Sequence, residues 1–243
     1  MTADYRERLF ARYDSTHAAY LDSDDVSKVR WFTEYARGNY LSHMRGFDRD
    51  SAEVLDIGCN KGYLLAALES LGWNRLHGVD LSLECTEKAR VLVPKAGISC
   101  VDANEFLDRN RGRFDVILLK AVLEHTPKEE VLPFLERICN GLRKGGVAIV
   151  DVPNMDWLFA PHERYMDFTH EVGFTIESLR QVLNVVFAEV RVEAVDIIPL
   201  LPFLADIRKR IARSILSALL RWADPQAGCG TLWKRTLVGI ARN

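Results

Sequence analysis

The sequence lacks the features of a disulfide-stabilised or membrane-spanning protein. Its 243 residues include only five cysteines, an odd number, with no C-x-x-C pair and no zinc-binding spacing. We therefore expect reduced cysteines that serve in packing. No window approaches the roughly 18 uninterrupted apolar residues of a membrane span, and the charged N-terminus has no apolar stretch typical of a signal peptide. These absences predict a cytoplasmic protein.

A strong net charge is also absent, because 32 Lys and Arg residues and 34 Asp and Glu residues give a net charge of −2. Nucleic-acid-binding domains usually carry a basic excess, so we expect no nucleic-acid partner. Apolar residues make up 48% and charged residues 27%, which is typical of a globular protein with a sizeable core. The length corresponds to about one and a half average domains and favours one domain with additions.

From about residue 51 onward, short apolar runs alternate with helical stretches, a pattern typical of a parallel sheet covered by helices. The expected strands are residues 53–58, 75–81, 98–102, 114–120, 146–152, 189–198 and 231–241. The expected helices between them are residues 61–71, 82–91, 105–109 and 128–142, with a further helix that begins near Thr175. Residues 153–174 are expected to be irregular, and the segment before residue 51 to be helical.

A glycine-containing turn follows the first expected strand, in the sequence VLDIGCNKGYLL. A strand that enters such a turn before a helix brings the backbone close to a ligand and presents free N–H groups. Asp80 ends the second strand, 22 residues after Gly58, where a carboxylate accepts both hydroxyls of a ribose. Asp102 ends the third strand, where it can meet an exocyclic amine. Together these positions predict an adenosine-containing ligand at the carboxyl edge of the sheet.

Over about residues 51–153, the chain resembles the class I S-adenosylmethionine-dependent methyltransferase family. The resemblance is carried by VLDIGCNKGYLL, HGVDLS, CVDANEF, FDVILLKAVLEHTP and LRKGGVAIVDVPN. It implies an α/β fold with a doubly wound, Rossmann-like sheet of seven strands in the order 3-2-1-4-5-7-6. The ending LVGIAR resembles the antiparallel last strand of that sheet. A helical N-terminal extension over residues 1–50 would precede a methyltransferase domain over residues 51–243.

The resemblance implies S-adenosylmethionine as the cofactor and S-adenosylhomocysteine as the product. The implied cofactor-binding residues are Asp56, Gly58, Cys59, Asn60, Gly62, Tyr63, Asp80, Leu81, Asp102, Ala103, Lys120 and Ala121. Asn60 stands where the family often has a glycine, and asparagine tolerates a left-handed backbone better than most residues. Leading helices commonly cover the cofactor in this family, so Tyr13 and His17 would contact it or else belong to an aromatic face packed on the sheet.

Two other interpretations of these motifs remain. A dinucleotide-dependent oxidoreductase would need G-x-G-x-x-G, whereas three non-glycine residues separate Gly58 from Gly62 and no second nucleotide-binding half follows. A cofactor-binding protein without turnover would keep the same fold and the same acidic residues. Neither interpretation explains the acidic strand ends better than a methyltransferase does.

The chemistry of the acceptor decides which further residues are needed. A hydroxyl acceptor must lose its proton, and a positioned histidine or carboxylate assists this step. The candidate catalytic residues are His125, after the fourth strand, and Asp167 and His170 in the loop after the fifth strand, with His162 nearby. Alternatively, His125 shapes the cofactor pocket, and Asp167 and His170 form a pair that holds the loop. No metal site is expected, because this loop offers few of the carboxylates that hard divalent ions prefer.

The acceptor class is suggested by the stretch DFTHEVGFT, residues 167–175, which resembles D-x-T-H-x-x-x-F-T in bacterial methyltransferases of polysaccharide and O-antigen clusters. That resemblance implies a small-molecule or glycan acceptor, with O-methylation of a saccharide hydroxyl as the preferred reaction. A quinone, a phenolic compound or a natural product is the alternative acceptor.

A helical insert at about residues 202–222 carries apolar residues every four positions. Its opposite side is basic, with Arg208, Lys209, Arg210, Arg213 and Arg221 against a single acid, Asp206. Such a helix can make peripheral contact with an anionic membrane, cover the acceptor pocket, pair with a second copy in a homodimer, or pack within the chain.

Overall fold

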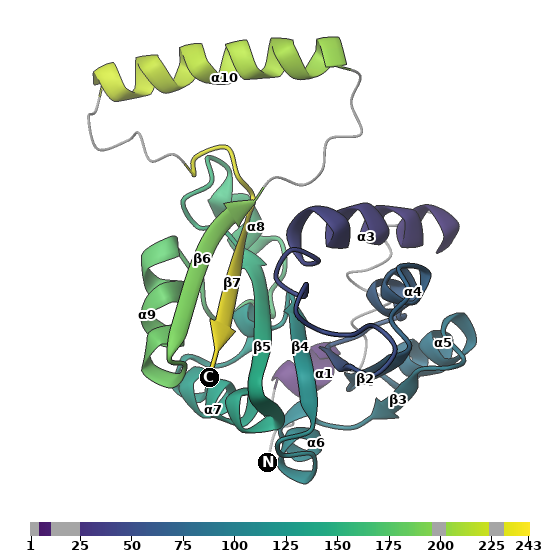
Figure 1. Cartoon of the computed structure of the whole chain (residues 1–243). Coiled ribbons are helices and arrows are strands. Elements are labelled where there is room, and N and C mark those ends of the chain that lie inside the picture. Colours follow the sequence, from purple (N-terminus) through teal and green to yellow (C-terminus); the bar gives the residue numbers. More distant parts are fainter. Residues whose placement is uncertain (1–4, 11–24, 196–202, 224–230) are drawn as a thin grey trace.

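The computed structural model describes residues 5–10, 25–195, 203–223 and 231–243, and its centre is a seven-stranded sheet (Figure 1). The strand order is β3-β2-β1-β4-β5-β7-β6. The strands are β1 (Glu53–Ile57), β2 (Arg75–Asp80), β3 (Gly97–Cys100), β4 (Phe114–Lys120), β5 (Leu142–Pro153), β6 (Glu189–Val195) and β7 (Thr236–Arg242). β7 is antiparallel to both β5 and β6, whereas β1 to β5 pair in parallel. The predicted strand order and the antiparallel last strand are therefore confirmed.

Helices cover both faces of this sheet (Figure 1). The α-helices are α1 (Tyr5–Phe10), α3 (Asp25–Asn39), α4 (Tyr63–Ser70), α5 (Leu83–Leu92), α6 (Ala103–Arg109), α7 (Val131–Gly141), α8 (Ala160–Tyr165), α9 (Ile176–Val186) and α10 (Phe203–Ala223). Two 3-10 turns, η2 (Leu123–His125) and η3 (Lys128–Glu130), follow β4. One core cluster packs α3 and α4 on the sheet, and a second packs α6, α7 and α9 on its opposite face.

The central strands are buried on both faces, which explains their nearly continuous apolar sequences. β1 is buried from Val54 to Ile57, and β4 is buried from Val116 to Leu119. Asp56 and Asp151 bring buried acidic side chains into this apolar centre near the carboxyl ends of β1 and β5. These ends form the edge where open α/β sheets bind their ligands.

The structure differs from the sequence-based expectation in several places. The segment expected to be irregular, residues 153–174, contains α8, whose six residues are too few to produce a helical period in the sequence. β5 begins at Leu142, earlier than expected, with an irregular register beside β4. β7 begins at Thr236 rather than at residue 231, because a turn closed by the Lys234 N–H and the Thr231 carbonyl precedes it. β6 ends at Val195, and residues 196–198 lie outside the described part of the chain.

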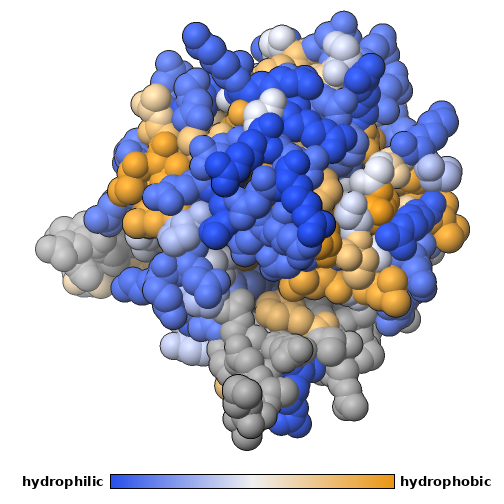
Figure 2. Space-filling model, turned by 90° about the horizontal axis from the view of Figure 1, so that it is seen from below, coloured by the Kyte–Doolittle hydropathy of each residue, from blue (hydrophilic) through white to orange (hydrophobic). Residues whose placement is uncertain are grey.

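The long helix α10 lies beyond the ends of β6 and β7 (Figure 1). Several of its described apolar side chains are exposed: Ile211 is 56% exposed, Ile215 57% and Trp222 87%. By contrast, the face of the molecule in Figure 2 is largely hydrophilic, with its apolar residues in separate patches, as is ordinary for a folded protein. Among the residues described, no helix combines the length and the apolar character that crossing a membrane requires.

Candidate functional site

The turn after β1 holds an unusual backbone conformation at three positions. Gly58, Asn60 and Gly62 have φ angles of 70°, 47° and 81°. A Cβ atom at Gly58 would lie 2.5 Å from Cγ2 of Val122, so only glycine fits there. Asn60 adopts the left-handed conformation expected of it, and its Oδ1 accepts a hydrogen bond from the Lys61 N–H at 2.7 Å. The turn therefore has the left-handed backbone that the sequence predicts, and it packs closely against Val122.

The carboxylate of Asp80 lies beside this turn. Its Oδ2 accepts the Asn60 N–H and its Oδ1 accepts the Ser82 N–H, both at 2.9 Å. Burial raises the pKa of Asp80, and these backbone donors lower it again in part. Each carboxylate oxygen has two lone pairs, so both can still accept a hydroxyl. The geometry suits a ligand with two neighbouring hydroxyl groups.

Asp56 is buried at the end of β1, with 2% of its surface exposed. Burial is the main cause that raises the pKa of its carboxyl to about 8; the charge of Asp80 adds to this increase, and Lys120 opposes it. A buried carboxyl group with a raised pKa favours a cation beside it, because the cation stabilises the ionised form. Asp56 is thus suited to the ammonium group of an amino acid.

Lys120, at the end of β4, belongs to a polar cluster around the buried carboxylate of Asp151. It is in register with Asp151 on β5, and its Nζ lies 3.3 Å from Oδ1 of Asp151. The hydroxyls of Tyr35 and Tyr40 donate to Oδ2 of the same carboxylate at 2.7 and 2.5 Å. Nζ of Lys120 also lies 4.4 Å from the centre of the Tyr35 ring. This cluster attaches α3 and the turn after it to the sheet.

The remaining predicted cofactor residues lie around the same edge. Asp102 is exposed and caps α6, because its Oδ1 accepts the N–H groups of Asn104 and Glu105. Ala103 begins that helix. Leu81 is 58% exposed, which is uncommon for a leucine directly after a buried strand.

Two residues of the turn face the protein's own side chains. The Tyr63 hydroxyl donates to Asp25 Oδ1 at 2.6 Å, which joins α4 to α3. Cys59 is buried, and burial is the main cause that raises the pKa of its thiol. The predicted residues Tyr13 and His17 lie outside the described residues.

β4 ends in a strained turn that leads to His125, one of the predicted catalytic residues. Ala121 has a φ angle of 54°, which is uncommon for a residue with a Cβ atom. The next turn, η2, buries Glu124 to 2% exposure, and neither of its carboxylate oxygens finds a hydrogen-bond partner among the described residues. Burial raises the pKa of Glu124 to about 8. This acid was not among the predicted site residues.

His125 is connected to Asp167 through Thr169. The Thr169 hydroxyl donates to Oδ1 of Asp167 at 2.7 Å, and Nδ1 of His125 lies 2.8 Å from the same hydroxyl oxygen. Because the hydroxyl proton points to Asp167, the oxygen accepts a hydrogen bond from Nδ1–H of His125. This chain fixes the ring and places the proton of its neutral form on Nδ1. Asp167 and Thr169 are 5% and 3% exposed, respectively.

His170 lies against His125, with ring centres 4.8 Å apart. Burial is the main cause that lowers the pKa of His170, so its neutral form is favoured near neutral pH. A carboxylate oxygen of Glu124 and one ring nitrogen each of His125 and His170 all lie within 4.8 Å of one another. His162 lies on the exposed side of α8, and this cluster does not include it. The structure thus brings together two of the predicted catalytic histidines and one acid.

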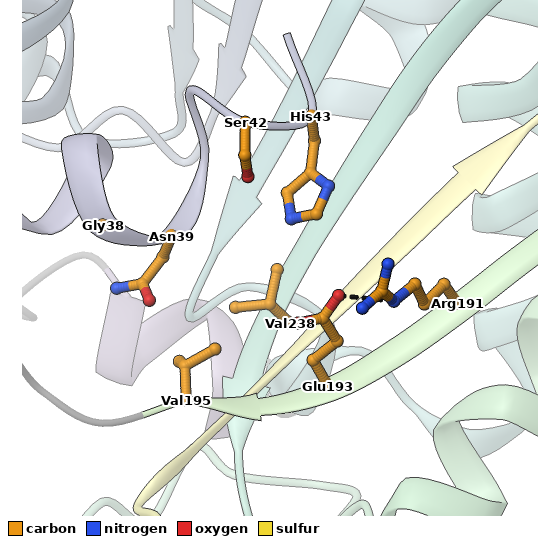
Figure 3. Close-up of a pocket in the computed structure, with 8 residues that line it drawn as sticks. All are labelled: Gly38, Asn39, Ser42, His43, Arg191, Glu193, Val195 and Val238. Atoms are coloured by element: carbon orange, nitrogen blue, oxygen red, sulfur yellow. Dashed lines mark ion pairs between the residues drawn. The ribbon is translucent and has the colours of Figure 1, made fainter.

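A separate pocket of about 340 Å³ lies on the β6–β7 side of the sheet (Figure 3). It is lined by Gly38, Asn39, Ser42, His43, Arg191, Glu193, Val195 and Val238. Arg191 and Glu193 form an ion pair of 2.6 Å across it. None of the predicted site residues lines this pocket, and the strand ends that carry Asp56 and Asp80 lie elsewhere. We therefore place the functional site at the strand ends.

Three residues of this edge were missed from the sequence. Asp151 interrupts an apolar strand, VAIVDVP, and a charge at that position is a signal that could have indicated a buried partner. Thr169 and Glu124 carry no such signal, because their roles depend on contacts with segments far away in the sequence. The assembled edge offers a close backbone turn, two strand-end acids, and a cluster of imidazole and carboxylate groups.

Known proteins are similar to this chain in sequence and in fold. The sequence matches the family described as a methyltransferase domain over residues 6–193, which is more than half of the chain. It is 33% identical over 108 residues to the ubiquinone biosynthesis O-methyltransferase of Bradyrhizobium diazoefficiens. That match covers 43% of this chain and 41% of the relative, so it spans less than half of either protein.

Solved structures also resemble the whole chain. A SAM-dependent methyltransferase from Archaeoglobus fulgidus has a TM-score of 0.64 at 19% identity, and the match covers 99% of this chain and 100% of that one. A Burkholderia thailandensis 1,6-didemethyltoxoflavin-N1-methyltransferase, solved with S-adenosylhomocysteine, has a TM-score of 0.60 at 19% identity, with 98% and 86% covered. At these identities the likeness establishes the fold.

Proposed function

We propose that this chain, which belongs to the methyltransferase domain family, transfers a methyl group from S-adenosylmethionine to a hydroxyl of a small-molecule or glycan acceptor. The observation that carries the proposal is the meeting of two sets of residues at one sheet edge. A glycine turn with Asp80 beside it fits a nucleoside. Glu124 and His125 follow the adjacent strand β4, and the loop after β5 brings His170 to them.

The residues present fit the cofactor. Gly58 lacks the Cβ atom that would lie 2.5 Å from Cγ2 of Val122, so the turn beside Asp80 packs closely against the segment after β4. Asp80 binds the ribose hydroxyls, and Asp56 binds the ammonium of the methionine end. Exposed Leu81 lies against the adenine, beside Asp102 and Ala103. The names of the two similar structures, which include SAM dependence and bound S-adenosylhomocysteine, agree with this assignment.

S-adenosylmethionine supplies an activated methyl group on a positively charged sulfur. The protein has to hold the acceptor oxygen in line with the methyl carbon and keep water out. As the new C–O bond forms and the C–S bond breaks, the hydroxyl proton must leave. Asp167 and Thr169 orient His125 for this step, and the lone pairs of Glu124, His125 and His170 assist the transfer of the proton to solvent.

The preferred acceptor is a saccharide hydroxyl, since residues 167–175 resemble methyltransferases of polysaccharide clusters. In the structure these residues carry the Asp167–Thr169 pair that holds His125, so the motif lies at the proposed acceptor side. A phenolic or quinol hydroxyl is the second candidate. The named activity of the Bradyrhizobium diazoefficiens relative favours it, over the limited region that matches.

We assign α10 a role at an anionic lipid surface. Ile211, Ile215 and Leu219 form an exposed apolar stripe, and the helix carries five basic residues against one acid. Apolar side chains that enter the headgroup region, with basic side chains beside them, are the features of a helix that lies on such a surface. A lipid-linked glycan or a quinol would reach the site from that surface.

A radiolabelled methyl-transfer screen tests the proposal. The intact protein is incubated with methyl-labelled S-adenosylmethionine and separate panels of saccharides, phenols and quinols. Label transfer to a hydroxyl that falls by about two to four orders of magnitude in His125→Ala and His170→Ala, but not in His162→Ala, is the expected result. Binding of S-adenosylhomocysteine without transfer to any panel would instead indicate a cofactor-binding protein without turnover.

A further inference from the structure

We propose that Glu124, His125 and His170 bind a divalent first-row transition-metal ion that holds the acceptor oxygen. The inference deepens the proposed function and rests on it for the role of the ion, but not for its binding. One ligand atom from each of the three residues lies within 4.8 Å of the other two. Metal–ligand bonds of about 2.0–2.2 Å place donor atoms roughly 3–3.5 Å apart, so small side-chain rotations complete the site.

The state of Glu124 is the independent observation that points to a cation. Its side chain is 2% exposed, and both carboxylate oxygens lack hydrogen-bond partners among the described residues. Burying an ionised carboxylate without a partner is costly, so native proteins pair such groups or use them as metal ligands. An ion held between Glu124 and the two histidines provides that compensation.

The surroundings of His125 match those of a metal ligand. A ligating histidine usually donates its other ring N–H to a carboxylate, a carbonyl or a bridging group, which fixes the ring. His125 makes such a contact through Thr169 to Asp167, and coordination through Nε2 keeps it intact. Backbone groups of Arg164 and Glu163 lie near the ring of His170. The ring of His125 is thus held before an ion arrives.

The donor set selects the kind of ion. Two imidazoles and one carboxylate favour Zn²⁺, Mn²⁺ or Fe²⁺, whereas Mg²⁺ and Ca²⁺ prefer oxygen ligands. The sequence-based expectation of no metal considered His162, Asp167 and His170, and only His170 belongs to the present set. Three protein ligands leave coordination positions open for an acceptor.

The ion would act on the proton of the acceptor. Coordination to a divalent cation lowers the pKa of a bound hydroxyl, so its proton leaves to solvent before methyl transfer. The coordinated oxygen then forms the C–O bond as the C–S bond of S-adenosylmethionine breaks, and the products are a methyl ether and S-adenosylhomocysteine. The charge and oxidation state of the ion do not change. Acceptors with two neighbouring oxygens, such as vicinal diols or catechols, fit two open positions.

Co²⁺ titration of the metal-free intact protein, without cofactor or acceptor, tests the site. We expect one Co²⁺ per chain, with visible d–d absorption and displacement by Zn²⁺. Glu124→Gln and His170→Ala should each weaken Co²⁺ binding at least tenfold, while the nearby control His162→Ala binds as the wild type does. Circular dichroism identifies any variant that fails to fold, and Glu124→Asp, which keeps the carboxylate, should retain partial binding.

The titration and the methyl-transfer assay together distinguish a failure of the metal site from a failure of the proposed function. Absence of Co²⁺ and Zn²⁺ binding below millimolar concentration, or equal binding by wild type and Glu124→Gln, would overturn the metal site. Label transfer that persists in chelator would then leave the methyltransferase proposal intact. Conversely, a site that binds Co²⁺ in a protein that methylates no hydroxyl would support the metal site and contradict the proposed reaction.

Discussion

The hydroxyl oxygen of Tyr40 lies 2.5 Å from Oδ2 of Asp151, although 111 residues separate them in the chain. Tyr35 donates to the same oxygen, and Lys120 pairs with the carboxylate from β4. The two tyrosine donors come from α3 and the residue directly after it, while Asp151 belongs to the strand β5. This buried cluster therefore determines where the N-terminal helix lies relative to the edge at which the cofactor is proposed to bind.

Tyr40→Phe should destabilise the protein by about 1.5–3 kcal/mol, because it removes a hydrogen bond to a buried charged group. Lys120 and Tyr35 remain as partners of Asp151, so the variant should still fold. Urea unfolding followed by circular dichroism measures the change. Tyr165→Phe is the matched control, since Tyr165 is 79% exposed, and it should leave the free energy of unfolding unchanged. Equal stability of the two variants would contradict the role of the cluster.

Gly58→Ala should destabilise the protein by about 2–4 kcal/mol and weaken the binding of S-adenosylhomocysteine. The new Cβ atom would lie 2.5 Å from Val122, and the φ angle of 70° adds strain. Gly46→Ala is the control, because a Cβ atom there meets nothing within 4 Å. The double variant Gly58→Ala with Val122→Ala removes the close contact, and it should lose less of the binding affinity for S-adenosylhomocysteine than Gly58→Ala alone. If Gly58→Ala behaved as Gly46→Ala does, the close approach would be wrong.

Strands and strand order could be predicted because parallel buried strands have nearly continuous apolar sequences that end in charged or turn-forming residues. The position of Asp80 followed from the same pattern, since strand ends meet at one edge. Helix α8 and the early start of β5 could not be predicted. A six-residue helix has too few turns to form a hydrophobic period, and the pairing of Leu142 with Phe114 depends on the neighbouring strand.

The reaction side of the site was predicted only in part. His125 and His170 were identified because histidines near strand ends are candidates for acid–base chemistry. The hydrogen-bond chain through Thr169 spans 44 residues of sequence and depends on the loop after β5 folding back over η2. Glu124 precedes His125 in the sequence, but its burial without hydrogen-bond partners among the described residues depends on the assembled packing.

Asp80→Asn should weaken the binding of S-adenosylhomocysteine by about tenfold to a hundredfold, which corresponds to one lost hydrogen bond to a charged group. Asparagine keeps the shape of the side chain but has one acceptor oxygen instead of two. Isothermal titration calorimetry on the wild type and the variant measures this change. The control Asp108→Asn alters an acid on the outer surface of α6 and should bind as the wild type does. Unchanged affinity in Asp80→Asn would remove the ribose assignment.

Asp56 should make the stability of the protein depend on pH. The pKa of its carboxyl is about 8 in the folded protein, mainly because of burial, and about 4 in an unfolded chain. The protonated form therefore favours folding, and its contribution is fully present below about pH 4 and is lost as the pH rises to about 8. Asp56→Asn, which stays neutral, should remove this loss.

Urea unfolding at several pH values between 5 and 8 measures the effect. The difference in stability between Asp56→Asn and the wild type should grow by up to about 1 kcal/mol per pH unit in this range. Glu129→Gln, at an exposed position of η3, should follow the wild type at every pH. A constant difference between Asp56→Asn and the wild type would show that the folded carboxyl has an ordinary pKa.

Ile211→Asp and Ile215→Asp should each reduce binding to anionic vesicles by tenfold or more, if α10 lies on a lipid surface. Both side chains are more than half exposed, so the substitutions should leave the fold unchanged, whereas an aspartate within the apolar stripe opposes entry into the headgroup region. Cosedimentation with vesicles of phosphatidylglycerol and phosphatidylcholine measures the binding, and vesicles of phosphatidylcholine alone should bind less because the basic side chains lose their anionic partners. Val185→Asp introduces the same charge at an equally exposed position on α9 and should bind vesicles as the wild type does. Equal cosedimentation of all variants would contradict the lipid contact. A dimeric wild type and a monomeric Ile211→Asp in analytical ultracentrifugation would assign the stripe to a contact between two copies instead.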